Sequence, residues 1–354
     1  MQERYFAAYT IGEDAFSKFN DVCKNLGTNF LLIGGKTALS VSRDKLMTYV
    51  CSEFNVVDEV IYGNECSEER VLELFDIYKD KEIDFIVGAG GGKAIDTSKF
   101  LADKLEIPVV TIPTIASTCA ASSALSVVYT PNHVFSKFAY YKKPAYHCFI
   151  DTEIISQSPY RFLRAGIGDT LAKHYEVEFS ARGRELDYSS ELGITISTMC
   201  NVPLMRYAKE ALKASLENTT SYELEQVILA IIISTGMVSM LINPDYNGAM
   251  AHAFFYGLTR IEGFEENFLH GDVVGYCTMV QLAVDQQLDE AKKIKAFLKS
   301  IGIETTLAER NIPCDKDFLD KVLESALNDP DMKVIPYTVT KDMLFDGILA
   351  VENF

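Results

Sequence analysis

Two histidines and one aspartate in the second half of the chain have the side chains expected of metal ligands. His252 lies in the segment Ala-His-Ala, His270 lies in Leu-His-Gly-Asp, and Asp169 follows Ala-Gly-Ile-Gly at the expected start of a helix. One carboxylate and two neutral imidazoles form a mixed oxygen–nitrogen donor set that suits Zn²⁺ or Fe²⁺ and leaves a position open for substrate. Spacing alone leaves other roles open, because each histidine can be a structural core residue and Asp169 a helix N-cap.

A cluster of glycines in the first half has the composition of an anion-binding loop. The sequence Val-Gly-Ala-Gly-Gly-Gly-Lys-Ala-Ile-Asp covers residues 87–96, between an expected strand and an expected helix. Glycines let phosphates approach the bare backbone, and a helix N-terminus offers free N–H groups to an anion. The cluster is neither GxGxxG nor a P-loop, since Lys93 and Val87 occupy positions that those motifs reserve for glycine. A turn that serves only chain geometry is the alternative.

Lys93 and Asp96 are three residues apart and therefore share one face of the expected helix. They form either an ion pair with each other or contacts to phosphate and ribose hydroxyls. The next strand leads into Thr-Ile-Pro-Thr-Ile-Ala-Ser-Thr-Cys at residues 111–119, a segment rich in small hydroxyl side chains. Open α/β sheets bind ligands at such connections, although a plain loop explains this segment equally well.

The elements around these residues predict an α/β fold in two parts. β-Branched runs at 30–33, 59–63, 83–87 and 109–112 alternate with helical patterns, which indicates a parallel sheet, and 126–130 with 135–141 indicates a hairpin. Strand patterns fade after residue 151, and long helices follow. We therefore expect a nucleotide-type α/β domain at 1–158 and an all-helical domain at 159–354, with a ligand site in the cleft that two such domains form.

Composition excludes several other classes. The 354 residues carry a formal charge of −17, which would repel nucleic acid and anionic membranes. Eight cysteines without paired spacing, behind an N-terminus with no signal-peptide pattern, predict reduced thiols in a cytoplasmic protein. The longest apolar stretch, 227–242, is interrupted by Ser, Thr and Gly and is shorter than the roughly 20 residues of a membrane span, so it predicts a core helix.

Five segments form a joint pattern: GAGGGKAIDTSK (88–99), TIPTIASTCAASSALSVVYT (111–130), FLRAGIGDTLAK (162–173), AHAFFYGLT around His252 and FLHGDVV (268–274). Taken together, they resemble the glycerol dehydrogenase branch of the iron-containing (type III) alcohol dehydrogenase superfamily. The resemblance implies a Rossmann-like N-terminal domain and a helical C-terminal domain, the dehydroquinate-synthase-like fold. It also implies a homo-oligomer that oxidises alcohols with NAD and one divalent metal, zinc before iron.

Matched position by position, the resemblance assigns roles to individual residues. Asp169, His252 and His270 correspond to the three metal ligands. The remaining matches correspond to coenzyme contacts: Gly90, Gly91, Gly92, Lys93, Asp96, Thr114, Ser117, Ser123, Leu125 and Tyr129. His174, His133 and His147 receive no role.

Three departures from the pattern bear on substrate and coenzyme. Cys119 stands where the glycerol dehydrogenases carry Asp near substrate, and Phe255 stands where they usually carry a second His. Both changes make the expected substrate pocket less polar. The glycerol dehydrogenases also carry an Asp after the strand that corresponds to 30–33, whereas this chain has no acid there and has Lys36 nearby. Because that acid rejects a 2′-phosphate, NADP becomes an alternative to NAD.

The predicted function is the metal-assisted oxidation of a small polyol or secondary alcohol to the ketone. A metal at the three ligands would lower the pKa of the substrate hydroxyl, and the nicotinamide would accept the hydride. The main alternative is a hydroxycarboxylate (2-oxo acid reducing) dehydrogenase, whose branch carries STCAA and GIGDTLAK. Two further interpretations, which fit the motifs less well, are a dehydroquinate-synthase-like lyase and a non-catalytic dinucleotide-binding protein.

Overall fold

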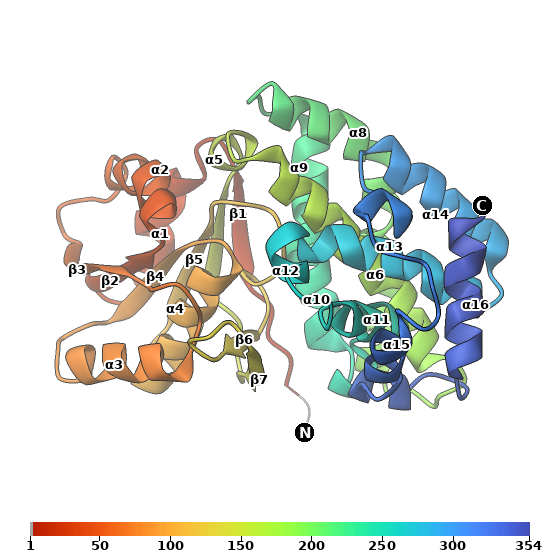
Figure 1. Cartoon of the computed structure of the whole chain (residues 1–354). Coiled ribbons are helices and arrows are strands. Elements are labelled where there is room, and N and C mark those ends of the chain that lie inside the picture. The colour runs from red at the N-terminus through yellow and green to blue at the C-terminus, as the bar shows by residue number, and fades with distance from the viewer. Residues whose placement is uncertain (1–2) are drawn as a thin grey trace. The chain divides into compact units, whose positions relative to one another are not determined.

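The computed structural model describes residues 3–354, which divide into two compact units (Figure 1). The first unit runs to Tyr160 and also takes in Ala214–Met240, and the second comprises Arg161–Lys213 and Leu241–Phe354. The first unit therefore ends near the expected boundary at 158, but it includes a later helical segment that we expected in the second domain. This segment packs in the first unit, where the Ser122 hydroxyl donates a hydrogen bond to the Ile232 carbonyl at 2.5 Å.

A six-stranded, wholly parallel sheet forms the centre of the first unit, in the order β1-β8-β5-β4-β2-β3. The prediction contained four of these strands and missed β1 and β8. Strands β6 and β7 form the expected antiparallel hairpin. The strands are β1 (Ala8–Gly12), β2 (Asn29–Gly34), β3 (Asn55–Ile61), β4 (Phe85–Gly90), β5 (Val109–Pro113), β6 (Leu125–Tyr129), β7 (Phe135–Tyr140) and β8 (His147–Asp151).

Alternation along β2 explains why both faces of this sheet are covered. Phe30 and Leu32 belong to one buried apolar cluster, whereas Leu31 and Ile33 belong to another. Successive side chains of a strand point to opposite faces, so a run of four apolar residues requires helices on both sides. The helices and helical turns of this unit are Ala15–Lys18, α1 (Phe19–Cys23), α2 (Lys36–Met47), α3 (Glu68–Tyr78), α4 (Gly92–Leu105), α5 (Thr152–Ser156) and α9 (Tyr222–Leu229), followed by a π-helical turn (Ala230–Ser234) and α10 (Thr235–Leu241).

The second unit is helical, as predicted. Its longest helix, α6, carries Asp169 in its interior, so the expected helix start at Asp169 and its alternative role as an N-cap were wrong. This helix packs against residues of the C-terminal third of the chain. The helices are α6 (Tyr160–Ala181), α7 (Tyr188–Ser197), α8 (Val202–Leu216), α11 (Met250–Leu258), α12 (Phe264–Asn267), α13 (His270–Val284), α14 (Leu288–Ser300), α15 (Asp320–Leu327) and α16 (Lys341–Glu352), with 3₁₀ turns at Thr198–Cys200, Pro244–Tyr246, Ala308–Arg310 and Pro330–Lys333.

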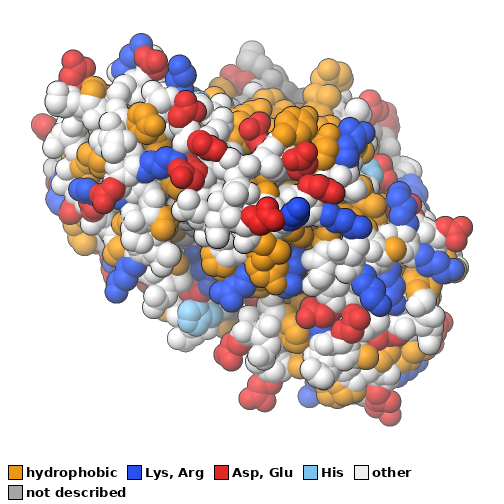
Figure 2. All heavy atoms as spheres, turned by 90° about the horizontal axis from the view of Figure 1, so that it is seen from above, with side chains coloured by type: hydrophobic (Ala, Val, Ile, Leu, Met, Phe, Trp, Pro, Cys, Tyr) orange, Lys and Arg blue, Asp and Glu red, His pale blue; other side chains and the backbone are white. Residues whose placement is uncertain are grey.

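One helical stretch, Tyr222–Leu241, is long and apolar enough by length and composition to cross a membrane. Of its most apolar window, 61% is buried inside the protein, which is typical of a core helix. This placement agrees with the core helix expected at 227–242. Acidic and basic side chains are interspersed on the face of the molecule shown in Figure 2.

Candidate metal centre and coenzyme loop

The structure brings the three predicted metal ligands together within the second unit. Asp169 comes from α6, His252 from α11 and His270 from α13, and one potential ligand atom of each lies within 4.8 Å of the others. His270 Nε2 is 3.2 Å from Asp169 Oδ1, and His252 Nε2 is 3.5 Å from the same oxygen. Both imidazoles therefore direct their Nε2 atoms at one point beside the carboxylate. We name these three residues the ligand triad.

Two glycines allow α6 and α13 to approach closely enough for this arrangement. A Cβ atom added to Gly168 would lie 2.2 Å from the Gly271 carbonyl oxygen, and one added to Gly271 would lie 1.8 Å from the Ala165 carbonyl oxygen. Asp169 and His270 are the direct sequence neighbours of these glycines. The contact between the two helix backbones thus sets the distance between two members of the ligand triad.

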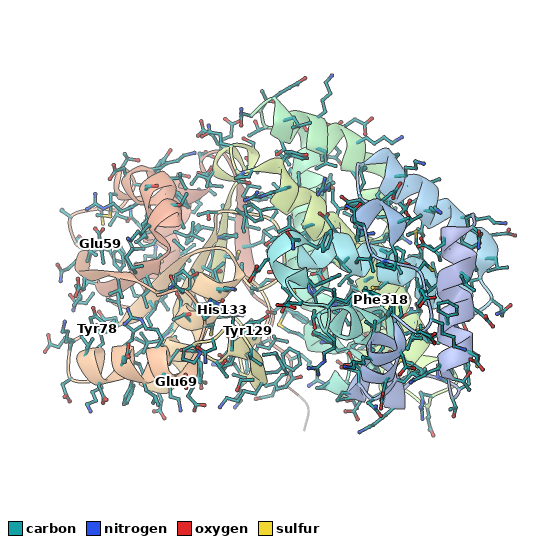
Figure 3. All side chains as sticks on the ribbon, viewed as in Figure 1. Glu59, Glu69, Tyr78, Tyr129, His133 and Phe318 are labelled. Carbon is teal, nitrogen blue, oxygen red and sulfur yellow. The ribbon has the colours of Figure 1, made fainter. Side chains whose placement is uncertain are left out.

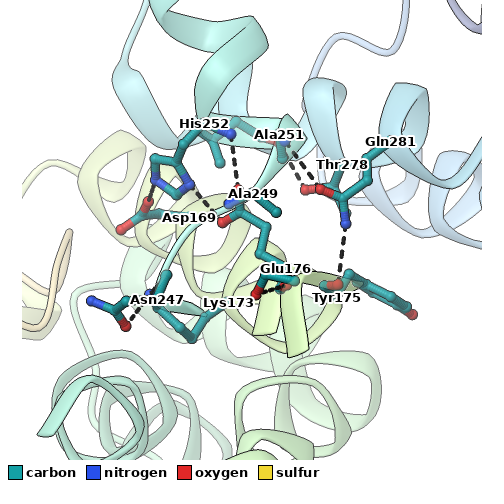
Figure 4. Close-up of polar contacts among 12 residues, drawn as sticks. Asp169, Lys173, Tyr175, Glu176, Asn247, Ala249, Ala251, His252, Thr278 and Gln281 are labelled. Atoms are coloured by element: carbon teal, nitrogen blue, oxygen red, sulfur yellow. Dashed lines mark hydrogen bonds and ion pairs between the residues drawn. The ribbon is translucent and has the colours of Figure 1, made fainter. Parts of the chain in front are cut away.

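The first turn of α11, which carries His252, is held by side chains of other helices. Glu176 of α6 accepts hydrogen bonds from the backbone N–H groups of Ala249 and His252, and its second oxygen lies 2.6 Å from His252 Nδ1. Gln281 of α13 accepts from the Ala251 N–H at 3.1 Å (Figure 4). Glu176 was absent from the sequence prediction, although it lies seven residues after Asp169 and therefore on the same face of α6.

The charges of this cluster suit a divalent cation. Burial alone would raise the pKa of Asp169, but the hydrogen bonds and charges of His252 and His270 outweigh it and hold that pKa below its usual range. Burial lowers the pKa of His252, but the charge of Glu176 and the hydrogen bonds to Asp169 and Glu176 raise it to about 10. Two carboxylates thus stabilise positive charge at one imidazole. One oxygen and two nitrogen donors, with a second carboxylate behind His252, fit Zn²⁺ or Fe²⁺.

Of three residues near the ligand triad in sequence, Phe255 contacts a member of the triad, whereas Lys173 and His174 have other partners. Phe255 is buried, and its ring packs edge-on against His270 with 4.3 Å between ring centroids. Lys173 directs its Nζ to the backbone and side-chain oxygens of Asn247. His174 lies outside the cluster, since its Nδ1 is 2.9 Å from the Ser197 hydroxyl.

The glycine loop (Gly90, Gly91, Gly92 and Lys93) joins β4 to α4 in the first unit. Gly90 has φ of +151°, which other residues rarely adopt, and a Cβ atom there would lie 2.8 Å from Ala94 Cβ. Gly91 is the N-cap of α4 and offers no side chain to the first-turn N–H groups. Free N–H groups at the start of a helix bind anions, so the loop has the form that a pyrophosphate requires.

Lys93 and Asp96 do not pair with each other. Lys93 forms an ion pair with Glu65, whose Oε1 also lies 2.5 Å from Nδ1 of His133 at the tip of the hairpin (Figure 3). Asp96 is buried, lies 3.0 Å from Lys99 Nζ and accepts a hydrogen bond from the Val127 N–H. Asp96 therefore fastens α4 to β6, and its contact with the coenzyme stays a prediction.

The other residues assigned to coenzyme or substrate follow β5 in the same unit. The Thr114 N–H donates to the Gly90 carbonyl at 3.1 Å, which links this segment to the glycine loop. The Tyr129 ring centroid lies 5.7 Å from Lys93 Nζ. Lys99 of α4 donates to the Ser123 carbonyl at 3.3 Å and to the Leu125 carbonyl. Cys119 is partly buried, as are Ser117 and Leu125. Their roles in binding remain predictions.

Comparison with known proteins agrees with this architecture. The profile of the family described as iron-containing alcohol dehydrogenase matches residues 7–152. A glycerol dehydrogenase from Thermotoga maritima is 33% identical over 307 residues, which are 84% of this chain and 82% of the relative. Hydroxycarboxylate dehydrogenase A from Escherichia coli is 32% identical over 91% of this chain and 89% of its own. The crystal structure of glycerol dehydrogenase from Schizosaccharomyces pombe superposes with a TM-score of 0.88 at 27% identity, covering 100% of this chain and 91% of that one.

The chain belongs to the iron-containing alcohol dehydrogenase family. Within this family it belongs to the glycerol dehydrogenase branch, since glycerol dehydrogenases match it over most of its length in both sequence and structure. The expected fold class and the resemblance stated from the sequence motifs are both confirmed.

Proposed function

We propose that the protein is an NAD-linked, metal-dependent alcohol dehydrogenase that oxidises a small polyol or secondary alcohol to the ketone. The observation that carries the proposal is the convergence of Asp169, His252 and His270, from three different helices, to within 4.8 Å. Similarity to glycerol dehydrogenases over most of the chain supports the same activity.

The ligand triad would hold the metal, and we propose Zn²⁺ before Fe²⁺. A divalent cation held there lowers the pKa of a substrate hydroxyl and thereby favours its ionised form. Asp169 would supply the anionic oxygen, and the two imidazoles would supply nitrogens in their neutral form, His252 losing its proton as the cation binds, and would leave a position open for the alcohol. Phe255, packed against His270, would form an apolar wall beside that position.

The glycine loop would bind the coenzyme pyrophosphate through backbone N–H groups, with Lys93 adding a positive charge. Bound NAD supplies the hydride acceptor for the reaction. Lys36 is exposed at the first residue of α2, directly after β2, and no acid occupies the adjacent positions 33–35. We therefore expect NADP to be tolerated beside NAD.

A hydroxycarboxylate dehydrogenase is the second candidate. Cys119 stands where the glycerol dehydrogenases carry Asp, and the relative from Escherichia coli named for that activity is 32% identical to this chain. Without an Asp carboxylate at that position, the pocket would not repel the carboxylate of a hydroxy acid. A homo-oligomeric, cytoplasmic enzyme remains our expectation, and the eight free cysteines support the location.

A substrate panel tests the proposal. Glycerol, short vicinal diols and 2-hydroxy acids are each incubated with NAD⁺ or NADP⁺, NADH or NADPH formation is followed by absorbance, and the same sample is analysed for zinc and iron. We expect reduction of the coenzyme with at least one alcohol, lost on treatment with a chelator and restored by the metal. A metal-free sample that reduces the coenzyme at full rate, or no reduction with any alcohol, contradicts it.

A further inference from the structure

The first turn of α11 lacks the usual means of capping its N-terminus. The N-cap residue is Ala249, which has no side chain able to accept a hydrogen bond from the turn. The first N–H groups of an α-helix have no partner inside the helix, and leaving them buried without a partner is costly. Acceptors on neighbouring helices must therefore supply the cap, and His252 lies in the same turn.

Two fully buried side chains supply these acceptors. Glu176 Oε1 accepts from the N–H groups of Ala249 and His252, at 3.0 and 2.9 Å. Gln281 Oε1 accepts from the Ala251 N–H at 3.1 Å, and Gln281 Nε2 donates to the Tyr175 carbonyl of α6. Glu176 is 0% exposed and Gln281 is 1% exposed, so water does not compete for these bonds.

Only Glu176 also reaches the imidazole. Its second oxygen lies 2.6 Å from His252 Nδ1, whereas Nε2 of the same ring faces Asp169. An ionised carboxylate can only accept, so Nδ1 carries the hydrogen of this contact, and Nε2 is the nitrogen that must give up its hydrogen when a metal binds. A carboxylate bound to the far nitrogen of a histidine ligand fixes both the tautomer and the orientation of the ring.

We propose that Glu176 is the positioning residue of the metal centre. It sets the direction of His252 Nε2 through one oxygen and the position of the first turn of α11 through the other, and Gln281 performs only the second of these tasks. The inference rests on the proposed function, because it concerns the ability of the triad to bind a divalent cation.

Glutamine at position 176 would conserve volume but not this pattern of contacts. Its amide has one acceptor oxygen and one donor NH₂ group, whereas all three partners of Glu176 are donors. Either the backbone N–H groups then face an NH₂ group, which displaces the first turn of α11, or Nδ1 accepts from that group and the ring hydrogen moves to Nε2, the nitrogen that the metal needs. Gln281→Leu is the matched control, since it removes a cap from the same turn without touching the imidazole.

The experiment measures Zn²⁺ affinity in the full-length protein by competition with a chromophoric chelator, and thermal unfolding of the metal-free protein. We expect Glu176→Gln to weaken Zn²⁺ binding about 10- to 100-fold, equivalent to about 1.4–2.8 kcal/mol. Gln281→Leu should lower the unfolding temperature but leave Zn²⁺ affinity within about threefold of wild type, since it leaves every donor atom in place. Glu176→Asp retains the carboxylate and should recover part of the affinity.

The outcomes separate the inference about Glu176 from the proposed function. Wild-type Zn²⁺ affinity in Glu176→Gln overturns the inference, as does an equal loss of affinity in Gln281→Leu, which would reduce Glu176 to a helix cap. If Glu176→Gln fails to fold, Glu176→Asp decides the matter: an affinity between those of wild type and the triad variant His252→Ala supports the inference, and one equal to wild type overturns it. A wild-type protein that binds no Zn²⁺ or Fe²⁺ contradicts the proposed function instead.

Discussion

Replacing Gly271 by alanine tests whether the close crossing of α6 and α13 builds the metal centre. The new Cβ would lie 1.8 Å from the Ala165 carbonyl oxygen and 3.1 Å from Asp169 Cβ, whereas ordinary contacts begin near 3.4 Å. The obstructing atom is backbone and cannot rotate away. The helices must therefore separate by roughly 1–2 Å to restore van der Waals distance.

Such a separation affects stability and metal affinity in different ways. Overpacking of a well-packed contact typically costs about 1–3 kcal/mol, while the better helix propensity of alanine returns up to about 1 kcal/mol. Metal–ligand distances tolerate only about 0.2 Å, so Asp169 and His270 could not both keep their positions. We expect a lower free energy of unfolding and Zn²⁺ affinity reduced by at least about tenfold.

Gly275→Ala is the matched control on the same helix. A Cβ there would lie 3.4 Å from Gly168 Cα and 3.5 Å from Leu298, which are ordinary contacts. We expect this variant to be neutral or stabilised by up to about 1 kcal/mol, with unchanged metal affinity. Urea unfolding and chelator competition measure both quantities. The reasoning is refuted if Gly271→Ala matches Gly275→Ala in both.

The remaining predictions concern the first unit. Burial lowers the pKa of His147 to about 4, so the free energy of unfolding should be highest above pH 6.5 and should fall by about 3 kcal/mol as the pH drops from 6.5 through 4. A His147→Gln protein should lack this fall when urea unfolding is measured as a function of pH. An equal pH dependence in both proteins would contradict the prediction. Gly236→Ala should destabilise the protein by about 1–3 kcal/mol, since its Cβ would lie 2.0 Å from the Ser122 hydroxyl oxygen. Adding Ser122→Ala should restore part of that loss in the double variant, whereas strictly additive losses would show that the two sites do not interact. Lys93→Ala should weaken NAD binding, measured by calorimetry, by about 1–3 kcal/mol through the loss of a charge-assisted contact, and unchanged affinity would remove Lys93 from the coenzyme site.

The parts of the fold that are encoded locally were predictable from sequence. The apolar run of β2 and the hairpin lie where their patterns indicate. Ser67 is the N-cap of α3, as expected of a hydroxyl residue that precedes a helical pattern. Strand β1 was missed because it lies at the sheet edge, half exposed and without a strong apolar pattern. The packing of Ala214–Met240 with the first unit depends on tertiary contacts, and no local pattern reports these.

In the metal centre too, some residues could be predicted from local sequence and others depend on tertiary contacts. Residue types and the resemblance to known dehydrogenases were sufficient to select Asp169, His252 and His270. Glu176 was missed although its spacing from Asp169 placed it on the correct face of α6. Its importance depends on a helix turn that has no cap of its own and begins 73 residues away in sequence. Side chains that cap another helix leave no periodic signal in their own segment.

The central claim is that the ligand triad holds one catalytic metal ion. It is tested most directly by measuring metal content, NAD binding and NADH formation together in the wild-type protein, Asp169→Ala and His270→Ala. We expect one zinc or iron per wild-type chain, and loss of both metal and NADH formation in each variant while NAD still binds. Full NADH formation by a metal-free His270→Ala protein would contradict it.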